Sequence, residues 1–462
     1  MSKEALWSHL VDEYQKVRPR SRAQFERATA VQIRGGSHTL RLFEPFPFYD
    51  ARSSGSTVED LDGFGYIDFW QGHYTNILGH NPEVVLSSLR DLFAAGQGLQ
   101  TGFPSSLQVE LAEEVCRRTG AERVRFTTTG ALGTLYSVML SRAFTGRTKV
   151  LKAGGGWHGA QPYLMKGVTR FLEQEGLNAA ESEGLHDGFS AGTITTRYND
   201  AAHLEEMFRR SGDSLACFIV EPFIGEGGFL FADPEYLSLA RRLTEQHGAL
   251  LVFDEVISGF RFCPNSLASL YQVRPDLSIF GKLLGGGMPI AAVAGRADVL
   301  ALCDPAAGAR RVKFEGGTFS AHPSSLVAGR VMLRHIKDNS EKIYPHIGRL
   351  AEKGRQGIEE IFSRHGIPAH CTGYPNRVAT SSSMSMVHFL RTERRCTSPE
   401  EVWNPGFCDP EMREKVFKLA LINRGYFPAH GFGSVSFAHT EAEIDGLLAA
   451  VEDVAKLMKR FS

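Results

Sequence analysis

Two apolar segments that end in a charged residue constrain this chain most strongly. The segment ALLVFDEV brings Asp254 to its carboxyl end, and DLSIFGKLLGGG brings Lys282 to a position just before three glycines. Short runs of β-branched and aromatic residues are typical of buried parallel strands. Ligand sites in open α/β sheets lie at the carboxyl ends of such strands. We therefore expect the carboxylate of Asp254 and the amine of Lys282 to meet in one pocket.

An acid and an amine in one pocket have a specific chemical use. A lysine among apolar residues and tight glycine turns has a lowered pKa and can act as a nucleophile. The lysine can carry pyridoxal phosphate (PLP) as a Schiff base while a carboxylate keeps the ring nitrogen of the cofactor protonated. The alternative interpretation is that Asp254 is an ordinary residue at a strand end and Lys282 an exposed loop lysine.

The order of elements predicts an α/β fold with two domains. From about residue 120, strand-like and helix-like segments alternate, which indicates a mostly parallel sheet with helices on both faces. The 462 residues exceed what one small core organises, and the alternation stops after Pro323. We expect a large cofactor-binding domain over residues 61–325 and a small α+β domain over residues 326–462. Residues 1–60 are expected to pack beside the small domain.

Three local predictions concern the helices. Residues 1–30 are predicted to form one amphipathic helix. A helix of the small domain is predicted to break near Gly348 or Gly354. The last helix is expected to begin with a capping box, in which Thr440 and Glu443 each accept a hydrogen bond from the backbone of the other.

Composition and charge exclude several classes of protein. The net charge is −1, so no basic surface indicates binding to nucleic acid or to a membrane. The chain contains no apolar run long enough to span a membrane, and its charged N-terminus lacks the apolar core of a signal peptide. The seven cysteines are scattered, without CxxC spacing, so neither a metal site nor a disulfide framework is expected. A cytoplasmic location and small-molecule partners fit these features best.

Two turns are candidates for holding a phosphate group. Thr129, Gly130 and Ala131 lie where a predicted strand passes into a helix, and the first amides of a helix bind anions. Thr318 lies in a second glycine-rich turn, after the Lys282 segment. Taken alone, the first turn is also explained as a helix cap and the second as an ordinary turn.

Three further residues are candidates for the surroundings of a flat ring. Trp157 follows a strand end and can stack on an aromatic cofactor, and His158 can hydrogen-bond near it. Each is also explained as a structural loop residue. Glu221 lies at another strand end, where it either supports the Asp254 region or is solvated.

Taken together, these motifs resemble the class III aminotransferases of fold type I, an α/β fold of PLP-dependent transferases. Within that family the chain is most similar to the glutamate-1-semialdehyde aminomutase-like branch. The resemblance covers nearly the whole chain, and it is carried by DGFGYIDF, ILGHNPEV, RFTTTGALGTLYSVMLSRAFTGR, GGGWHG, VEPFIGEGGF, LLVFDEVISGFR, PDLSIFGKLLGGGMPI, EGGTFSAHP and SFAHTEAEID.

The resemblance implies a role for each matching residue. Lys282 would form the internal aldimine with PLP and move a proton between the substrate and the cofactor. Asp254 would keep the ring nitrogen protonated, and Val256 would pack on the ring face opposite Trp157. Thr318 would reach the phosphate of the neighbouring subunit, which implies a homodimer with shared active sites.

Two departures from the family pattern affect these expectations. The phosphate turn, usually Ser-Gly-Thr/Ser-Glu-Ala, has Ala131 and Leu132 in place of the second hydroxyl and the acid, so backbone amides are expected to bind the phosphate. In addition, the aminomutases carry an acid shortly before the AHT triplet, whereas this chain has none between His430 and His439. This second departure favours a plain aminotransferase.

Candidates on the substrate side follow from charge and from the resemblance. Arg41 and Arg424 could bind a substrate carboxylate through a paired hydrogen bond, although both are also explained as surface residues. Gln71, His73 and Tyr74 match positions that line the substrate pocket of related aminomutases. Their polar and aromatic side chains suggest a substrate with a ring or hydroxyl groups.

The leading functional hypothesis is a PLP-dependent aminotransferase. It would move an amino group from an amine donor to a carbonyl acceptor in two half-reactions through Lys282. The alternative is an aminomutase of the glutamate-1-semialdehyde type. A third hypothesis, from another class, is a non-catalytic PLP-fold scaffold or regulator, which the presence of both Asp254 and Lys282 disfavours.

Overall fold

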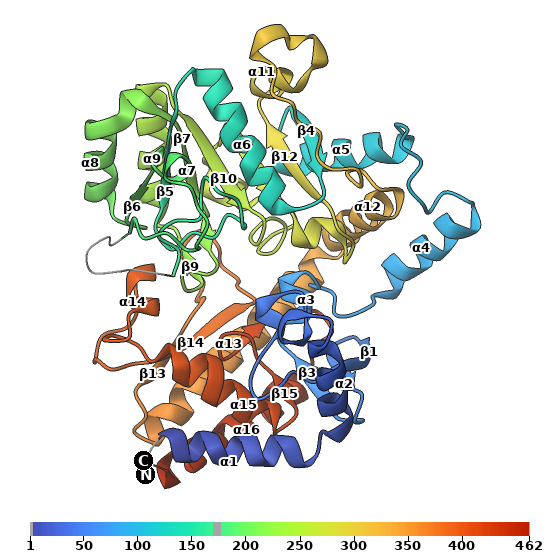
Figure 1. Ribbon diagram of the computed structural model, residues 1–462, viewed down its shortest axis with the longest axis vertical. Helices are drawn as coiled ribbons and strands as arrows, with labels where there is room; N and C mark the ends of the chain where they lie inside the picture. The colour runs from blue at the N-terminus through green and yellow to red at the C-terminus, as the bar shows by residue number, and fades with distance from the viewer. Residues whose placement is uncertain (1–2, 170–176, 462) are drawn as a thin grey trace.

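A seven-stranded sheet forms the centre of the part drawn at the top of Figure 1, which we call the upper lobe. The structure is a computed structural model that describes residues 3–169 and 177–461. In spatial order the strands are β4 (Arg123–Thr127), β12 (Ala291–Gly295), β11 (Leu277–Phe280), β10 (Leu250–Glu255), β7 (Leu215–Val220), β5 (Lys149–Ala153) and β6 (Thr193–Thr196). Only β12 runs antiparallel to its neighbours in this sheet.

Helices cover both faces of this sheet because its strands are apolar on both sides. Successive side chains of a strand point to opposite faces. On β7, Ile219 packs in one cluster with Val138 of α6 (Gly130–Thr145). The adjacent Phe218 packs in another cluster with Leu237 of α9 (Pro234–His247). The predicted α/β fold with a mostly parallel sheet is therefore confirmed.

The pairing of β10 with β11 positions the two residues that the sequence singles out. The strands are parallel and in register, with Asp254 opposite Ile279 and Glu255 opposite Phe280. Lys282 follows β11 after one glycine and begins a short 3₁₀ turn, Lys282–Gly285. Asp254 and Lys282 therefore both lie at the carboxyl ends of these two neighbouring strands.

The lower lobe combines segments from the two ends of the chain. A four-stranded sheet contains β1 (Asp50–Ser54), β2 (Thr57–Asp60), β3 (Gly65–Asp68) and, parallel to β3, β15 (Tyr426–Phe427). A second sheet contains β13 (Ala369–Thr372), β14 (Met384–Phe389) and β16 (Gly433–Ser434). Figure 1 accordingly draws blue and red segments side by side, with the two termini adjacent.

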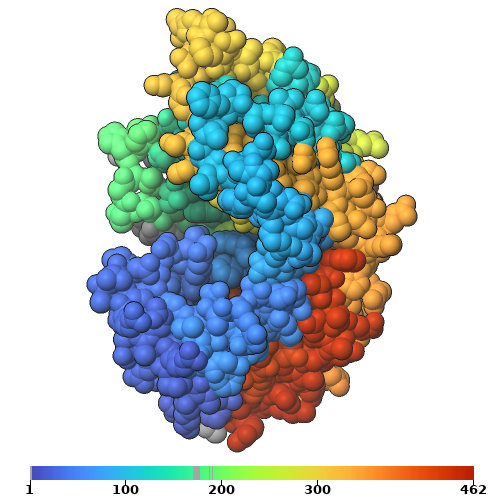
Figure 2. Space-filling view, turned by 90° about the vertical axis from the view of Figure 1, so that its right-hand side faces the viewer, coloured from blue at the N-terminus to red at the C-terminus, as the bar shows by residue number. Residues whose placement is uncertain are grey.

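The remaining elements complete the two lobes and connect them. The helices are α3 (Gln71–Tyr74), α4 (Glu83–Ala94), α5 (Ser106–Thr119), α7 (Asp187–Ser190), α8 (Ala201–Ser211), α10 (Leu267–Tyr271), α11 (Ala297–Leu300), α12 (Pro323–Asp338), α14 (Pro399–Trp403), α15 (Lys418–Ile422) and α16 (Glu441–Arg460); the strands are β8 (Phe223–Ile224) and β9 (Leu230–Phe231). Figure 2 shows a hollow between the blue N-terminal segment and the green part of the upper lobe. Within the described residues, no helix has both the length and the apolar composition needed to cross a membrane.

Two helix predictions are wrong, one for a local reason and one because of a contact with a distant segment. Of the segment predicted as one helix, residues 3–30 form two, α1 (Lys3–Lys16) and α2 (Pro19–Thr29), because a proline is tolerated in the first turn of a helix but interrupts its interior. Conversely, α13 (Ser340–Arg364) continues through both of its suspected break points. A Cβ atom on Gly354 would lie 2.5 Å from the ring of Phe432, so this glycine permits close packing and does not end the helix.

The capping box at the start of α16 is confirmed and allows a test of local stability. The Thr440 side chain accepts a hydrogen bond from Glu443 N, and Glu443 accepts one from Thr440 N. Replacing Thr440 with Ala should lower the free energy of unfolding by about 1 kcal/mol, because the first turn loses an acceptor. Denaturant titration measures this change. Thr440→Ser, which keeps the hydroxyl, should behave like the natural protein, and equal losses in both variants would contradict the role of the cap.

Candidate active site

A cavity of about 860 Å³ lies at the carboxyl ends of β10 and β11. It contains most of the residues that the sequence singled out. Those that line it are Arg41, His73, Tyr74, Thr129, Gly130, Ala131, Trp157, His158, Glu221, Asp254, Val256 and Lys282. Val168, Thr169 and Glu181 cover part of the cavity from the long segment between β5 and β6. Residues that are far apart in the chain therefore share one site.

Lys282 reaches the cavity from a left-handed turn. Its φ of 46° is unusual for a residue with a side chain, and such conformations occur preferentially at functional sites. Burial lowers the pKa of Lys282 to about 8, although the nearby carboxylate of Glu221 acts in the opposite direction. The fraction of free amine near neutral pH is thus much larger than for an ordinary lysine, which favours a nucleophilic role.

Asp254 is buried and held by two hydrogen bonds. Its Oδ2 lies 2.9 Å from His158 Nδ1, and its Oδ1 accepts a hydrogen bond from Val256 N at 3.0 Å. Burial lowers the pKa of His158, so the ring is neutral and its Nδ1–H donates to the carboxylate. This arrangement fixes a carboxylate that can receive a hydrogen bond from a protonated ring nitrogen in the cavity.

Glu221 is a buried support of the cavity wall. It accepts hydrogen bonds from Trp157 N at 2.8 Å and from Gly225 N at 3.0 Å, and only 3% of its surface is exposed. Burial, together with the neighbouring Asp254, raises the pKa of Glu221 to about 8. The interpretation of Glu221 as a solvated strand end is therefore excluded, since it holds the backbone of two cavity loops.

Lys152 holds the same wall and was missed from the sequence. Its buried ammonium group donates to three carbonyl oxygens, those of Gly156, Leu164 and Lys166, at 2.9, 3.2 and 2.7 Å. Burial lowers the pKa of Lys152 to about 7. Because its Nζ is committed to these carbonyls, Lys152 orders the loop that carries Trp157 and does not compete with Lys282 as a reactive amine.

The start of α6 provides the candidate phosphate site. The Thr129 side chain caps the helix by accepting a hydrogen bond from Leu132 N. The other amides of a first helical turn have no acceptor within the helix, and they attract anions. A Cβ atom on Gly130 would lie 2.8 Å from the Val256 side chain, so only glycine fits between the helix and this cavity residue.

The opposite side of the cavity contains several ionisable groups that sequence reasoning did not single out. His38, Glu226 and His430 line the cavity together with Arg41 and His73. The rings of His38 and His73 meet edge to face, with centroids 5.0 Å apart. Burial lowers the pKa of His73 to about 3, and nearby cations add to this effect, so its imidazole is neutral.

Glu226 and His430 differ in what shifts their pKa values. Burial raises the pKa of Glu226. Burial alone would lower the pKa of His430, but Glu414, at 2.8 Å, raises it overall. None of the missed cavity residues lies at the end of a predicted strand. The weak signal available was the position of Glu226 five residues after Glu221 in the same motif.

Three predicted site residues do not line this cavity. Gln71 is buried, and its side-chain amide donates to Asp68 O at 2.6 Å. Arg424 donates to Ala420 O at 2.8 Å, within α15 and the turn after it. Thr318, which was expected to act in a neighbouring subunit, is exposed.

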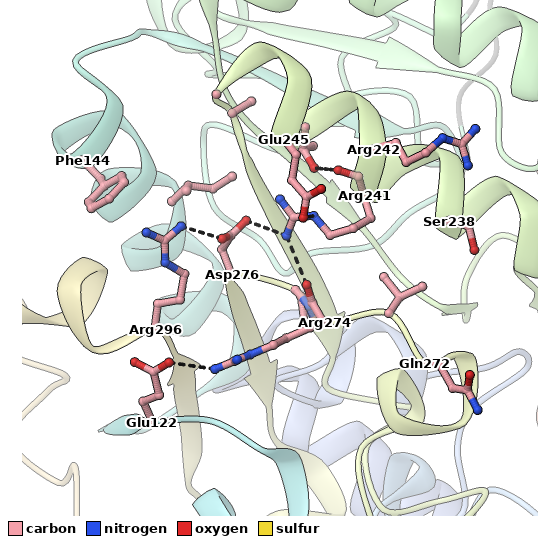
Figure 3. Close-up of a pocket in the computed structure, with 16 residues that line it drawn as sticks. Glu122, Phe144, Ser238, Arg241, Arg242, Glu245, Gln272, Arg274, Asp276 and Arg296 are labelled. Carbon is pink, nitrogen blue, oxygen red and sulfur yellow. Dashed lines mark hydrogen bonds and ion pairs between the residues drawn. The ribbon is translucent and has the colours of Figure 1, made fainter.

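A second cavity, of about 840 Å³, lies at the amino ends of the same strands (Figure 3). Asp276 accepts hydrogen bonds there from Arg241 at 2.9 Å and Arg296 at 2.8 Å, and Arg274 pairs with Glu122 at 2.7 Å. These ion pairs tie β11 to its surroundings. The second cavity is therefore explained by an ion-pair network and is not the candidate active site.

Comparisons with known proteins agree with this geometry. A family model described as aminotransferase class-III matches residues 43–369. A protein named glutamate-1-semialdehyde 2,1-aminomutase from Thermoplasma acidophilum is 32% identical, over 94% of this chain and 98% of its own. The chain belongs to the class III aminotransferases.

Solved structures extend this agreement to the fold and the cofactor. An omega-transaminase from Sphaerobacter thermophilus is 26% identical, with a TM-score of 0.84 over 96% of this chain and 98% of its own. A transaminase with PLP bound is 27% identical, with a TM-score of 0.81 over 96% and 98%. The family recognised from the motifs is therefore confirmed, and so is PLP as the cofactor.

The residues of the cavity fit PLP, although their individual roles stay predictions. We expect the first turn of α6 to hold the phosphate and Asp254 to face the ring nitrogen. Trp157 and Val256 both line the cavity, where they can contact the ring. His158 Nε2 is buried and has no hydrogen-bond partner among the described residues, so a bound group or water can satisfy it.

The lowered pKa of Lys282 predicts how the apoprotein captures PLP. The rate constant of capture should rise as the pH increases through about 8, because the amine loses its proton there. In the natural protein, the carboxylate of Glu221 raises the pKa of Lys282. The variant Glu221→Gln lacks this carboxylate, so the midpoint should move to lower pH. Stopped-flow absorbance measures both profiles.

Chemical labelling provides the matched control. Borohydride reduction followed by peptide mapping should locate the cofactor on Lys282 and not on Lys152, another lysine whose pKa is lowered by burial. A profile that rises only near the ordinary lysine pKa of 10.5, or a label on Lys152, would contradict the assignment.

Proposed function

We propose that the chain is an aminomutase that moves an amino group within a small amino-aldehyde of the glutamate-1-semialdehyde type. The observation that carries the proposal is the end-to-end similarity to relatives of that name, at 32% identity, in a chain that has both Lys282 and Asp254. These relatives favour the aminomutase alternative over the two-substrate aminotransferase that the sequence alone puts first. Membership of a PLP-dependent enzyme family holds for either activity.

The cavity residues divide the work in a consistent way. PLP, when bound, supplies an electron sink for breaking bonds at the amine-bearing carbon. Lys282 Nζ holds the cofactor and then moves a proton at the reacting carbon. Asp254, oriented by His158, keeps a positive charge on the ring nitrogen. Glu221 and Lys152 fix the loop that carries Trp157, so the ring is expected to lie in one orientation.

Arg41 is the proposed partner of the substrate carboxylate. Its side chain lines the cavity on the side of His38 and His73, whose imidazoles are kept neutral by burial. A guanidinium group binds a carboxylate through two parallel hydrogen bonds. Arg41 thus places a permanent positive charge beside two neutral imidazoles, which suits a small acidic substrate.

The second candidate function is transfer between two separate substrates. One observation favours it: the stretch HGFGSVSFAH, from His430 to His439, contains no acid, whereas the aminomutase pattern has one before the AHT triplet. Without that acid, the site would release its amino product between half-reactions. The two candidates therefore differ in whether turnover requires a second substrate.

We propose further that the chain works as a homodimer with shared sites. Leu99, Phe103 and Phe319 expose 73%, 81% and 60% of their surface, and exposed apolar groups of this kind mark interfaces. Gln100 Nε2 donates to Thr318 O at 2.7 Å, so Thr318 belongs to the same surface. A second copy covering this surface would let Thr318 approach the phosphate in the partner's cavity.

The two candidate functions give different results with a single substrate. Holoenzyme given glutamate-1-semialdehyde alone should convert it to the isomer with the amino group on carbon 1, and NMR of the product detects the change. A two-substrate aminotransferase would instead need an added carbonyl acceptor for repeated turnover. If no amine donor changes the visible spectrum of the holoenzyme, both activities are contradicted and the scaffold hypothesis gains support.

Arg41 can be tested against a second arginine that serves as its control. Arg41→Ala should raise KM for an acidic substrate by roughly 10- to 100-fold, the equivalent of losing a charged hydrogen bond of about 1.5–3 kcal/mol. The change in kcat should be small if the contact is equally strong in the transition state. Arg424→Ala should leave KM unchanged, because Arg424 does not line the cavity. An unchanged KM in the Arg41 variant would remove this assignment.

A further inference from the structure

His388, Cys396 and Cys408 form a buried cluster in the lower lobe, outside the active-site cavity. One potential ligand atom from each lies within 4.8 Å of the other two. The sulfur atoms of the two cysteines are 3.0 Å apart, and both side chains are free thiols. The three residues expose 0, 4 and 1% of their surface. Two thiols and an imidazole therefore share one space that is closed to solvent.

The backbone holds this cluster in place from several segments. His388 lies on β14, and the chain returns to that strand after an excursion, with Cys408 paired to Leu390. Asp409 N donates to Phe389 O at 2.8 Å and continues this pairing. Within the excursion, Cys396 N donates to Nε2 of His370 at 3.1 Å. The positions of the three side chains thus do not depend on one flexible loop.

Hydrogen bonds determine which nitrogen of His388 can bind a metal. The single hydroxyl proton of Thr372 is donated to Gly228 O at 2.5 Å, so Thr372 Oγ1 must accept from His388 Nε2–H at 2.9 Å. The lone pair therefore lies on Nδ1, which accepts a hydrogen bond from Arg413 at 3.2 Å. A histidine whose other N–H is fixed by an acceptor is the usual arrangement in metal sites.

We propose that His388, Cys396 and Cys408 bind one zinc ion. Two thiolates and a neutral imidazole are a ligand set that zinc prefers. Donors around a tetrahedral zinc ion stand roughly 3.3–3.8 Å apart, as follows from bond lengths of about 2.0–2.3 Å, so the side chains need to shift by about 1 Å. The fourth position falls to water.

The charges balance when the metal binds. Both thiols lose their protons to solvent, and two thiolates neutralise the two positive charges of zinc. Nδ1 of His388 exchanges the hydrogen bond from Arg413 for the metal. Arg413 keeps the hydrogen bond from its Nε to Glu414 at 2.6 Å, a carboxylate that it shares with His430. Zinc with its two thiolates therefore adds no net charge to the core of the lobe.

The proposed metal braces the wall of the active site. It fastens the excursion that carries α14, which Figure 1 draws below β9. Trp403 Nε1 donates to Glu226 O at 2.9 Å, and a Cβ atom on Gly228 would lie 2.6 Å from Val402. Both contacts join α14 to the loop that carries the cavity residue Glu226. Zinc would thus fix, from outside, the position of one side of the substrate cavity.

Metal analysis of the purified holoenzyme tests the proposal. After gel filtration in zinc-free buffer, elemental analysis should find one zinc ion per chain. The double variant Cys396→Ser/Cys408→Ser should retain less than a tenth of that amount. Cys303→Ser, which alters a buried cysteine of the upper lobe, is the matched control and should keep its zinc. Zinc that is absent from the natural protein, or equally retained by the double variant, overturns the proposal.

A second measurement covers the case in which the double variant fails to fold. Natural protein stripped of metal and given Co²⁺ should show intense thiolate-to-cobalt absorption and the visible bands of a tetrahedral site. It should also unfold at a higher temperature after zinc is added. The absence of both effects overturns the proposal. A mass lower by two hydrogens, with peptides linked through Cys396 and Cys408, also overturns it, because it identifies the pair as a disulfide.

Discussion

Parallel pairing between β10 and β11 is the interaction on which the rest of the structure depends. The two strands are buried along their whole length, so their carboxyl ends are fixed relative to each other by backbone hydrogen bonds and by apolar packing on both faces. Asp254 and Lys282 inherit this rigidity. A site built on strand ends holds its geometry better than one built on loops alone, and loops then need only supply the walls.

Burial also raises the free energy of every charged group near the carboxyl ends of these strands. The structure offsets this cost separately for each group. Asp254 receives two hydrogen bonds, Glu221 receives two from backbone amides, and Lys152 donates to three carbonyls. Lys282 differs from Lys152 because no carbonyl accepts a hydrogen bond from its amine among the described residues. Its compensation comes partly from loss of its proton, and this makes it reactive. The chemistry therefore follows from one amine that the fold leaves without a full set of partners.

Much of the fold and of the cofactor side could be predicted from the sequence, because both depend on strand periodicity and on residues at strand ends. The substrate side could be predicted only in part, since Arg41, His73 and Tyr74 line the cavity and Gln71 and Arg424 do not. Gln71, His73 and Tyr74 lie in a run of positive φ angles that also includes Gly72. Such a run sets side-chain directions that no periodicity describes, so Tyr74 and His73 line the cavity while Gln71 turns away.

The sequence also did not show which glycines and prolines interrupt a helix. Pro19 divides the N-terminal helix, whereas Gly354 lies inside a continuous one because a neighbouring ring needs its space. The proposed zinc ligands had no signal in the sequence, since eight and twelve residues separate them and the strand pairing alone brings them together. For Gly354 and for the proposed zinc ligands, the missing information was a contact between distant segments.

The shared sheet of the lower lobe has a consequence for how the chain is made. Ile67 pairs with Tyr426, so the strand order of that sheet is complete only after nearly the entire chain has left the ribosome. The upper lobe lies between these two positions in the sequence and contains mostly pairings among its own strands. It can therefore fold during synthesis, while the N-terminal strands wait with an unpaired edge. When β15 pairs with β3, the N-terminal and C-terminal segments come together. This pairing brings Arg41 and His73 to the cavity, whose upper-lobe residues are by then already in place.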